Sequence, residues 1–224
     1  MSRPLITFYV VAYNHASFIR EAVAAALAQT WSPLEIILSD DCSTDDTFSI
    51  MTEMASSYRG HHVVVVRQNR RNLGVGKHIN QVLSTAKGEF IVASAGDDVS
   101  RPDRTERLYE AWLRTNPRVS LVYSNIIETD EWGKPLSCRD FAAEKGLSAK
   151  GPLIQWSLDD HIAGRSASVH GCSFAYRREV FEEFGPLADS VIFEDNVFNW
   201  RAEGMSGLAL LRDPWSTTGT TTSR

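Results

Sequence analysis

The feature that most constrains the fold is a regular alternation over residues 5–127, where short β-branched runs are separated by segments long enough for helices. Four of the five runs are largely continuous apolar sequences, as expected for strands that are buried on both faces of a sheet. The alternation is typical of an α/β fold, a mostly parallel sheet with helices on both faces. We expect strands at 5–12, 34–39, 61–67, 89–95 and 120–126, and helices at 17–29, 46–58, 76–86 and 103–115.

The second part of the chain is less regular. A polar stretch at 128–134 predicts a hairpin turn, and residues 137–170 are rich in Gly, Ser, Ala and charge. The Ser- and Thr-rich segment 216–224 has no apolar periodicity, so we expect a disordered tail there. The remaining expected elements are helices near 152–160, 179–184 and 194–202, and strands at 172–176 and 207–211.

Length, charge and cysteine usage exclude several classes of protein. The 224 residues suffice for one large domain, and no apolar run approaches the roughly 20 residues that span a bilayer. Because the start also lacks the pattern of a signal peptide, we expect a cytoplasmic protein without a transmembrane segment. The net charge of -5 argues against a nucleic-acid partner. Three widely spaced cysteines fit neither a disulfide framework nor a zinc site.

Two adjacent carboxylates, Asp97 and Asp98, follow the expected strand 89–95. Such a pair is repulsive unless a cation or a hydrogen-bonding ligand lies between the two groups. Capping of the next helix does not explain them, because Pro102 and Asp103 already serve that helix start. Mg²⁺ or Mn²⁺ is held by a few carboxylate oxygens together with phosphate oxygens and water. We therefore predict a divalent metal that holds a diphosphate.

Two other polar loops follow expected strands, at the edge where open α/β sheets bind ligands. Tyr13 and Asn14 offer a ring and an amide to a flat base, although a tyrosine at a strand end can equally serve packing. Asp40 and Asp41 precede residues that suffice to cap the next helix. One of these two acids therefore accepts a hydrogen bond from a base or a ribose, or else is a second capping acid near the helix dipole.

A glycine-containing loop, residues 69–77, precedes the expected helix 76–86. Gly74, Gly76 and Lys77 form a plausible phosphate cradle of backbone amides and one cation. The spacing is not that of a Walker A loop, so binding of ATP in the P-loop manner is disfavoured. The nearby run of arginines from 67 to 71 reads as a solvated loop.

A last acidic pair, Glu194 and Asp195, opens the expected helix 194–202. Either acid can cap this helix. A carboxylate at this position, if it lies beside the metal, can instead act as a general base toward a hydroxyl nucleophile.

Taken in order, these loops form a set of blocks with characteristic spacing. The blocks are VAYNHASFI at 11–19, QTW at 29–31, EIILSDDCSTD at 35–45, NLG at 72–74, GEFI at 88–91, GDD at 96–98 and PD at 102–103, followed by GCSFAYRR at 171–178 and ED at 194–195. The set closely resembles the family 2 glycosyltransferases of the GT-A fold. The resemblance is strong over residues 5–127 and continues through the two later blocks.

The resemblance implies a GT-A (Rossmann-like) fold with a smaller irregular acceptor-side portion. Residues 1–127 would form the half that binds a nucleotide-sugar, and 128–215 the acceptor-side and catalytic half of the same domain. The implied reaction moves a sugar from a UDP-sugar or other NDP-sugar to a hydroxyl of a saccharide or lipid-linked acceptor, with inversion in one displacement. A lipid-linked acceptor implies peripheral association with the inner face of the membrane.

The resemblance also implies roles for individual residues. Tyr13 would stack on the base and Asp41 would bond it, while Asp97 would contact the ribose or the metal. Asp98 would hold the metal, and Asp195 would deprotonate the acceptor. The residues that we assign to donor binding are Ala12, Tyr13, Asn14, Asp40, Asp41, Asn72, Gly74, Lys77, Gly96 and Asp97, with Mn²⁺ or Mg²⁺ on Asp97 and Asp98.

Two alternatives remain at this point. A sugar-nucleotide nucleotidyltransferase shares the layered sheet, but the glycine-rich loop expected after its first strand is missing here. A nucleotide-sugar-binding module that has lost catalysis through truncation would bind the donor without turnover. Ala95 stands where many family members have the first acid of their metal motif, so metal binding would depend on Asp97 and Asp98 alone.

Overall fold

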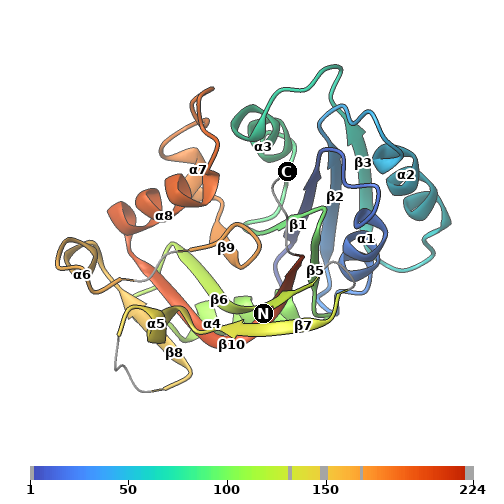
Figure 1. The fold of residues 1–224 in the computed structure, drawn as a ribbon. Helices are drawn as coiled ribbons and strands as arrows, with labels where there is room; N and C mark the ends of the chain where they lie inside the picture. Colours follow the sequence, from blue (N-terminus) through green and yellow to red (C-terminus); the bar gives the residue numbers. More distant parts are fainter. Residues whose placement is uncertain (1–2, 131–132, 147–150, 167–168, 220–224) are drawn as a thin grey trace.

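The computed structural model describes residues 3–130, 133–146, 151–166 and 169–219. Within these residues, ten strands form one sheet that is flanked by helices (Figure 1). The strands are β1 (Ile6–Ala12), β2 (Leu34–Asp40), β3 (Val63–Gln68), β4 (Phe90–Ala95), β5 (Asp98–Ser100), β6 (Leu121–Thr129), β7 (Pro135–Arg139), β8 (Leu153–Trp156), β9 (Phe174–Arg177) and β10 (Leu208–Gly219). The helices are α1 (Ile19–Leu27), α2 (Thr47–Ser57), α3 (Val75–Leu83), α4 (Arg104–Arg114), α5 (Phe141–Glu144), α6 (Leu158–Ile162), α7 (Glu179–Glu182) and α8 (Glu194–Met205).

The first part of the sheet is parallel, in the order β3-β2-β1-β4. Alternate side chains of β1 point to opposite faces, so Phe8 packs with residues of α1, α2 and α4. Its neighbour Tyr9 packs with residues of α3 and α8 on the other face. β1 and β2 are buried on both faces, as their largely apolar sequences predict. The predicted α/β fold is confirmed.

The rest of the sheet is mixed. β9 lies between β4 and β6 and is antiparallel to both. β10 then runs parallel to β6 and pairs in antiparallel fashion with β5 and β8. The predicted strand 120–126 exists as β6, but it does not adjoin β4, because a strand from much later in the chain separates them. One sheet thus joins the two predicted halves of the chain.

The helix predicted near 152–160 is wrong over its first part. Leu153–Trp156 forms β8, in which buried Ile154 and Trp156 alternate with exposed Gln155. This is the period of two that a half-buried strand requires. A helix, α6, begins only after Ser157, whose side chain and that of Asp160 form a reciprocal capping box.

The disordered tail predicted at 216–224 is also wrong over its described part. The backbone at 216–219 continues β10, and Thr218 lies opposite Asp98 of β5 while Ser216 lies opposite Ile126 of β6. Sheet pairing uses backbone groups that every non-proline residue carries, so it needs no apolar periodicity. Residues 220–224 lie outside the described residues. The hairpin predicted at 128–134 joins β6 to β7, and its residues 131–132 also lie outside them.

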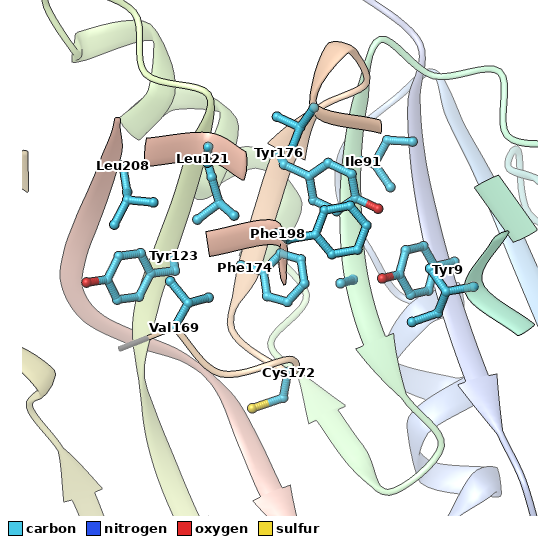
Figure 2. Packing of buried hydrophobic residues seen from close by; sticks show 14 of the residues in the cluster. Tyr9, Ile91, Leu121, Tyr123, Val169, Cys172, Phe174, Tyr176, Phe198 and Leu208 are labelled. Atoms are coloured by element: carbon cyan, nitrogen blue, oxygen red, sulfur yellow. The ribbon is translucent and has the colours of Figure 1, made fainter. Parts of the chain in front are cut away.

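An aromatic cluster fixes α8 on the sheet (Figure 2). The rings of Tyr176 on β9 and Phe198 on α8 stack with their centroids 4.5 Å apart. Phe174 on β9 contacts both, with ring centroids 5.6 Å from Tyr176 and 5.9 Å from Phe198. Because these rings are fully buried, the position of α8 relative to β9 is set by close packing. The cluster thereby carries the acidic start of α8 toward the end of β1.

Candidate functional site

A cavity of about 560 Å³ lies at the carboxyl ends of β1 and β4, where open α/β sheets bind ligands. The start of α3 and the start of α8 form its other walls. The residues that line it are Val11, Ala12, Tyr13, His15, Asp41, Asn72, Gly74, Val75, His78, Ile79, Ala95, Ile192 and Glu194. Five of the predicted donor-binding residues are therefore brought together: Ala12, Tyr13, Asp41, Asn72 and Gly74.

The loop after β1 presents Tyr13 to the cavity. Asn14 adopts a left-handed backbone with φ of +56°, and its Oδ1 accepts a hydrogen bond of 2.9 Å from the amide of Thr44. Its own amide donates to Oγ of Ser43 over 2.8 Å. Asn14 therefore ties this loop to the loop after β2 and does not line the cavity, whereas Tyr13 is left 42% exposed at the cavity wall.

The two acids after β2 have different positions. Asp40 is fully buried, and its oxygens accept hydrogen bonds from the side chains of Ser43 and Gln68. One of the same oxygens also accepts the amide of Ser43 over 2.9 Å. Asp40 thus closes the turn that follows β2, and it is not among the residues lining the cavity.

Asp41 lines the cavity and holds its glycine loop. Its Oδ1 accepts hydrogen bonds from Nδ2 of Asn69 (2.6 Å) and the amide of Leu73 (2.9 Å). Its Oδ2 accepts from the amide of Gly74 over 2.9 Å, which helps to fix the start of α3. Gly74 has φ of +76°, a conformation that favours glycine. The loop before α3 is therefore organised by one carboxylate.

The predicted cation Lys77 does not line the cavity. Its Nζ forms an ion pair of 2.9 Å with Asp189, and both groups are well exposed. The next residue, His78, is buried and lines the cavity instead. Nε2 of His78 lies 2.7 Å from Oγ of Ser39, and burial lowers the pKa of His78 to about 4. This imidazole is therefore neutral at physiological pH.

Gly96 allows the loop after β1 to approach the end of β4. A Cβ at this position would lie 2.7 Å from both Cβ of Ala12 and Nδ1 of His15, which is closer than real contacts. Nδ1 of His15 is buried without a hydrogen-bond partner and lies 3.9 Å from Oδ1 of Asp97. Gly96 therefore brings the polar groups of two loops together beside the cavity.

Asp98 begins β5 and is buried, and its Oδ2 accepts a hydrogen bond of 3.1 Å from the amide of Ala95. Burial, followed by the charge of Asp97, raises the pKa of Asp98 well above its usual range. Arg104, which is fully buried, offsets part of this effect. Its guanidinium donates to the carbonyl oxygen of Ala93 (2.8 Å) and to Oγ of Ser100 (3.0 Å), so it joins β4 to β5.

Asp97 and Asp98, which follow β4, fit a divalent cation. Burial and Asp97 both disfavour the charged form of Asp98, and Nδ1 of His15 is left without a partner nearby. Within the described residues no group of three His, Cys, Asp or Glu side chains could hold a metal ion. Mg²⁺ and Mn²⁺ sites that are completed by phosphate oxygens and water need only one or two carboxylates. Asp97 and Asp98 are the residues that would supply them.

The acidic pair at the start of α8 has one member in the cavity. Glu194 lines it, and burial, followed by the charge of Asp195, raises the pKa of Glu194 to about 7. A Cβ at Gly171 would lie 2.9 Å from Oε1 of Glu194, so this glycine leaves room for the carboxyl group. Asp195 is half-buried and is not among the lining residues, and its Oδ1 accepts the amide of Asn196 over 2.8 Å.

His15, His78 and Arg104 are site residues that the sequence did not predict, whereas Glu194 belongs to the acidic pair predicted at the start of α8. His15, His78 and Glu194 line the cavity, and Arg104 donates to the carbonyl oxygen of Ala93 in β4, the strand that precedes the acidic pair. His15 and Glu194 stand inside blocks that carry the family resemblance, so their position in these blocks was an available signal. His78 and Arg104 lie on helices at positions that a solvated face would also explain, and only packing shows that they are buried.

Solved structures show the class to which this fold belongs. The structure of Staphylococcus aureus TarS 1-349 in complex with UDP-GlcNAc aligns with a TM-score of 0.72 at 20% identity, over 98% of this chain and 59% of that chain. The mannosyltransferase PcManGT from Pyrobaculum calidifontis, in complex with GDP-Man and Mn²⁺, aligns with a TM-score of 0.72 at 20% identity, over 100% of this chain and 59% of that one. The fold is the GT-A fold of glycosyltransferases.

The sequence identifies the family. The model of Glycosyl transferase family 2 matches residues 7–185, and the chain belongs to this family. Putative glycosyltransferase EpsE of Bacillus subtilis is 30% identical over 67% of this chain and 53% of its own length. Succinoglycan biosynthesis protein ExoO of Rhizobium meliloti is 31% identical over 80% of this chain and 48% of its own length. The chain thus spans about half the length of these two relatives.

No helix among the described residues is long and apolar enough to cross a membrane.

Proposed function

We propose that this chain forms the donor-binding and catalytic region of an inverting glycosyltransferase. The observation that carries the proposal is the cavity shared by Tyr13, Asp41 and Glu194, which come from three distant parts of the sequence. The cavity brings together an aromatic ring that can stack on a base, a loop whose backbone amides are held in place, and the acidic start of a helix. The acid pair Asp97 and Asp98 follows β4, which forms one side of this cavity.

The donor would be a nucleotide-diphosphate sugar. The exposed ring of Tyr13 can stack on a base. Asp41 accepts the amides of Leu73 and Gly74 and so fixes the loop from which Asn72 and Gly74 line the same cavity. Structures with this fold contain UDP-GlcNAc in TarS and GDP-Man with Mn²⁺ in PcManGT, which supports the ligand class. The four hydrogen bonds at Asp41 occupy much of its accepting capacity, so we assign it mainly to positioning the loop.

A divalent cation would complete the site at Asp98, with Asp97 beside it. When bound, such a cation neutralises charge that develops on the leaving diphosphate. Asp98 would supply a carboxylate oxygen as a ligand of this cation. The role of Arg104 is to hold β5, which begins at Asp98, against β4 through its bonds to Ser100 and Ala93.

The start of α8 would supply the general base. Burial, followed by the charge of Asp195, raises the pKa of Glu194 to about 7, so Glu194 is the member of the pair that can retain a proton near neutral pH. We assign Asp195 as the base and Glu194 as a hydrogen-bonding group of the cavity. Asp195 takes the proton of the acceptor hydroxyl, the acceptor oxygen bonds to the anomeric carbon, and the bond from that carbon to the diphosphate oxygen breaks. The configuration of the sugar is inverted.

The acceptor would be a hydroxyl of a saccharide, free or lipid-linked. Relatives of this chain include a protein named for succinoglycan biosynthesis and a chondroitin synthase of Escherichia coli, which supports a saccharide acceptor. Peripheral association with a membrane, which a lipid-linked acceptor would require, stays a prediction.

Two measurements test the proposal. The first is calorimetry with Mn²⁺ and a panel of nucleoside diphosphates, in which wild type binds at least one of them and Asp98→Ala does not. The donor site would be refuted if wild type bound none of these ligands, or if Asp98→Ala bound them as well as wild type does. The second measures turnover of the bound donor, by transfer or by hydrolysis. Asp195→Asn should bind the donor normally and turn it over about a hundred- to ten-thousandfold more slowly.

Glu194→Gln is the matched control for the second measurement, because a glutamine mimics a protonated glutamate. It should keep most of the turnover. If Glu194→Gln loses turnover and Asp195→Asn keeps it, the two roles are reversed. If wild type binds the donor without any turnover, the chain is a nucleotide-sugar-binding module.

A further inference from the structure

A second hollow, of about 590 Å³, lies beside the donor cavity on the side of the edge strand β3. Its lining comes from the end of β3, the following loop and α3. The residues are Arg67, Gln68, Asn69, Arg70, Arg71, Leu73 and Gln81. The lining includes three arginines and three side-chain amides, and no carboxylate. This composition is unusual for a chain whose net charge is -5.

Arg67 is held in a fixed position in this hollow. Its Nη1 donates to Oγ of Ser39 and its Nη2 to Oδ1 of Asn69, each over 2.6 Å. Burial lowers the pKa of Arg67, with Asp41 opposing this effect. A guanidinium that is already held by two hydrogen bonds loses little further freedom when it binds a ligand.

Arg70 and Arg71 are exposed at the same hollow. Within the described part of the chain, neither side chain forms an ion pair or a hydrogen bond. Exposed Arg20, Arg114 and Arg165, in contrast, pair with Glu53, Glu110 and Asp160. Three guanidinium groups around one concavity repel each other unless an anion lies between them. Guanidinium groups match the geometry of phosphate oxygens through paired N–H donors.

We propose that this hollow binds a phosphate group, either as free phosphate or on a small phosphate ester. The amides of Gln68 and Gln81 would complete the set of donors around the oxyanion. The site is distinct from the donor cavity, although the two are neighbours, because Asn69 bonds both Arg67 and Asp41. The proposal does not rely on the proposed glycosyltransferase activity.

Calorimetry at low ionic strength and without divalent metal tests the site, with inorganic phosphate and glucose 1-phosphate as separate probes. Wild type should bind at least one, and the tighter of the two identifies the source of the phosphate group. The double variant Arg70→Gln/Arg71→Gln should bind that probe about tenfold more weakly or worse, since it loses two charge-assisted donors. The double variant Arg114→Gln/Arg165→Gln removes the same charge elsewhere and should bind within about twofold of wild type.

Three results would overturn the site: no binding to wild type, equal binding to Arg70→Gln/Arg71→Gln, or equal losses in both double variants.

A further titration in the presence of saturating UDP and Mn²⁺ places the ligand. Phosphate binding that persists supports a separate hollow, and binding that UDP abolishes assigns phosphate to the donor cavity and overturns the proposal. If UDP itself does not bind, the donor proposal fails while the phosphate titration without UDP still decides this one. Both altered arginines are exposed, so equal melting temperatures serve as the check on folding.

Discussion

Oδ2 of Asp41 accepts a hydrogen bond of 2.9 Å from the amide nitrogen of Gly74, so an acid at the end of one strand determines where the next but one helix begins. The same carboxylate also accepts the amide of Leu73. The site therefore depends on a carboxylate whose oxygens already accept hydrogen bonds from the protein's own backbone amides. The consequence is measurable by a single isosteric substitution.

Asp41→Asn should loosen the loop at Leu73 and Gly74, because an amide group offers one accepting oxygen where the carboxylate offers two. We expect the free energy of unfolding to fall by about 1–3 kcal/mol. Affinity for a nucleoside diphosphate should fall at least about tenfold. Urea unfolding and calorimetry measure the two effects. Asp46→Asn, at an exposed position without a side-chain cap, is the control and should change neither. Unchanged stability of Asp41→Asn would contradict the positioning role.

Asp98→Asn should separate folding from metal binding. Because burial raises the pKa of Asp98, a neutral side chain costs less to bury, while its oxygen can still accept the amide of Ala95. The melting temperature of the metal-free protein should therefore be equal to or higher than that of wild type. The increase in melting temperature that Mn²⁺ and UDP produce together should disappear. An increase that survives in Asp98→Asn would place the cation elsewhere.

Glu194 should make the stability of the metal-free protein depend on pH. Its folded pKa is about 7, above the value near 4.5 of an exposed glutamate, so the folded state holds a proton that the unfolded state has released. The contribution of this group to stability therefore falls as the pH rises from about 4.5 to 7, by up to about 3 kcal/mol, and stays level above pH 7.

Glu194→Gln should remove this dependence. Compared with wild type, the variant should gain stability above pH 7 and show little difference at pH 4.5. Urea unfolding at several pH values in the presence of a chelator measures the difference. Glu183→Gln, which changes an exposed acid, should run parallel to wild type across the range. A pH-independent difference between Glu194→Gln and wild type would exclude the raised pKa.

Gly96→Ala should disturb the approach of two loops. The added methyl group would meet Ala12 and His15 at 2.7 Å, so one loop has to move. We expect a loss of about 1–3 kcal/mol in stability, with weaker donor binding. Gly204→Ala is the matched control, because this helical glycine has open space around it and should gain about 0.5–1 kcal/mol. Equal effects of the two substitutions would show that the close approach is unimportant.

The parallel part of the fold was predictable because its signals are local. Strands such as Ile6–Ala12 and Leu34–Asp40 are largely apolar, and each ends at a polar loop. The insertion of β9 between β4 and β6 was not predictable, since it depends on pairing between segments that are far apart in sequence. The strand at Leu153–Trp156 resembles a helix in sequence, because four residues show too little periodicity to separate the two patterns.

The site was predictable to a different extent. Tyr13, Asp41 and Gly74 lie at the cavity because each follows directly on a strand or begins a helix, which fixes its position on the sheet edge. Lys77 was placed in a phosphate cradle, but its partner Asp189 is more than a hundred positions away, and no local pattern shows that ion pair. The arginines at 67–71 were read as a solvated loop, because a sequence does not show that a hollow lies between them.

The pairing of Thr218 with Asp98 affects the order in which the chain can fold as it leaves the ribosome. The sheet β3-β2-β1-β4 can assemble before residues 216–218 are made, because all four of its strands lie between Ile6 and Ala95. β5, by contrast, pairs with a strand that lies more than a hundred residues further along the chain. Long-range pairing of this kind is slow to form. The acid on which we place the metal would thus acquire its final environment late, after the loops that follow β1 and β2 are already in position.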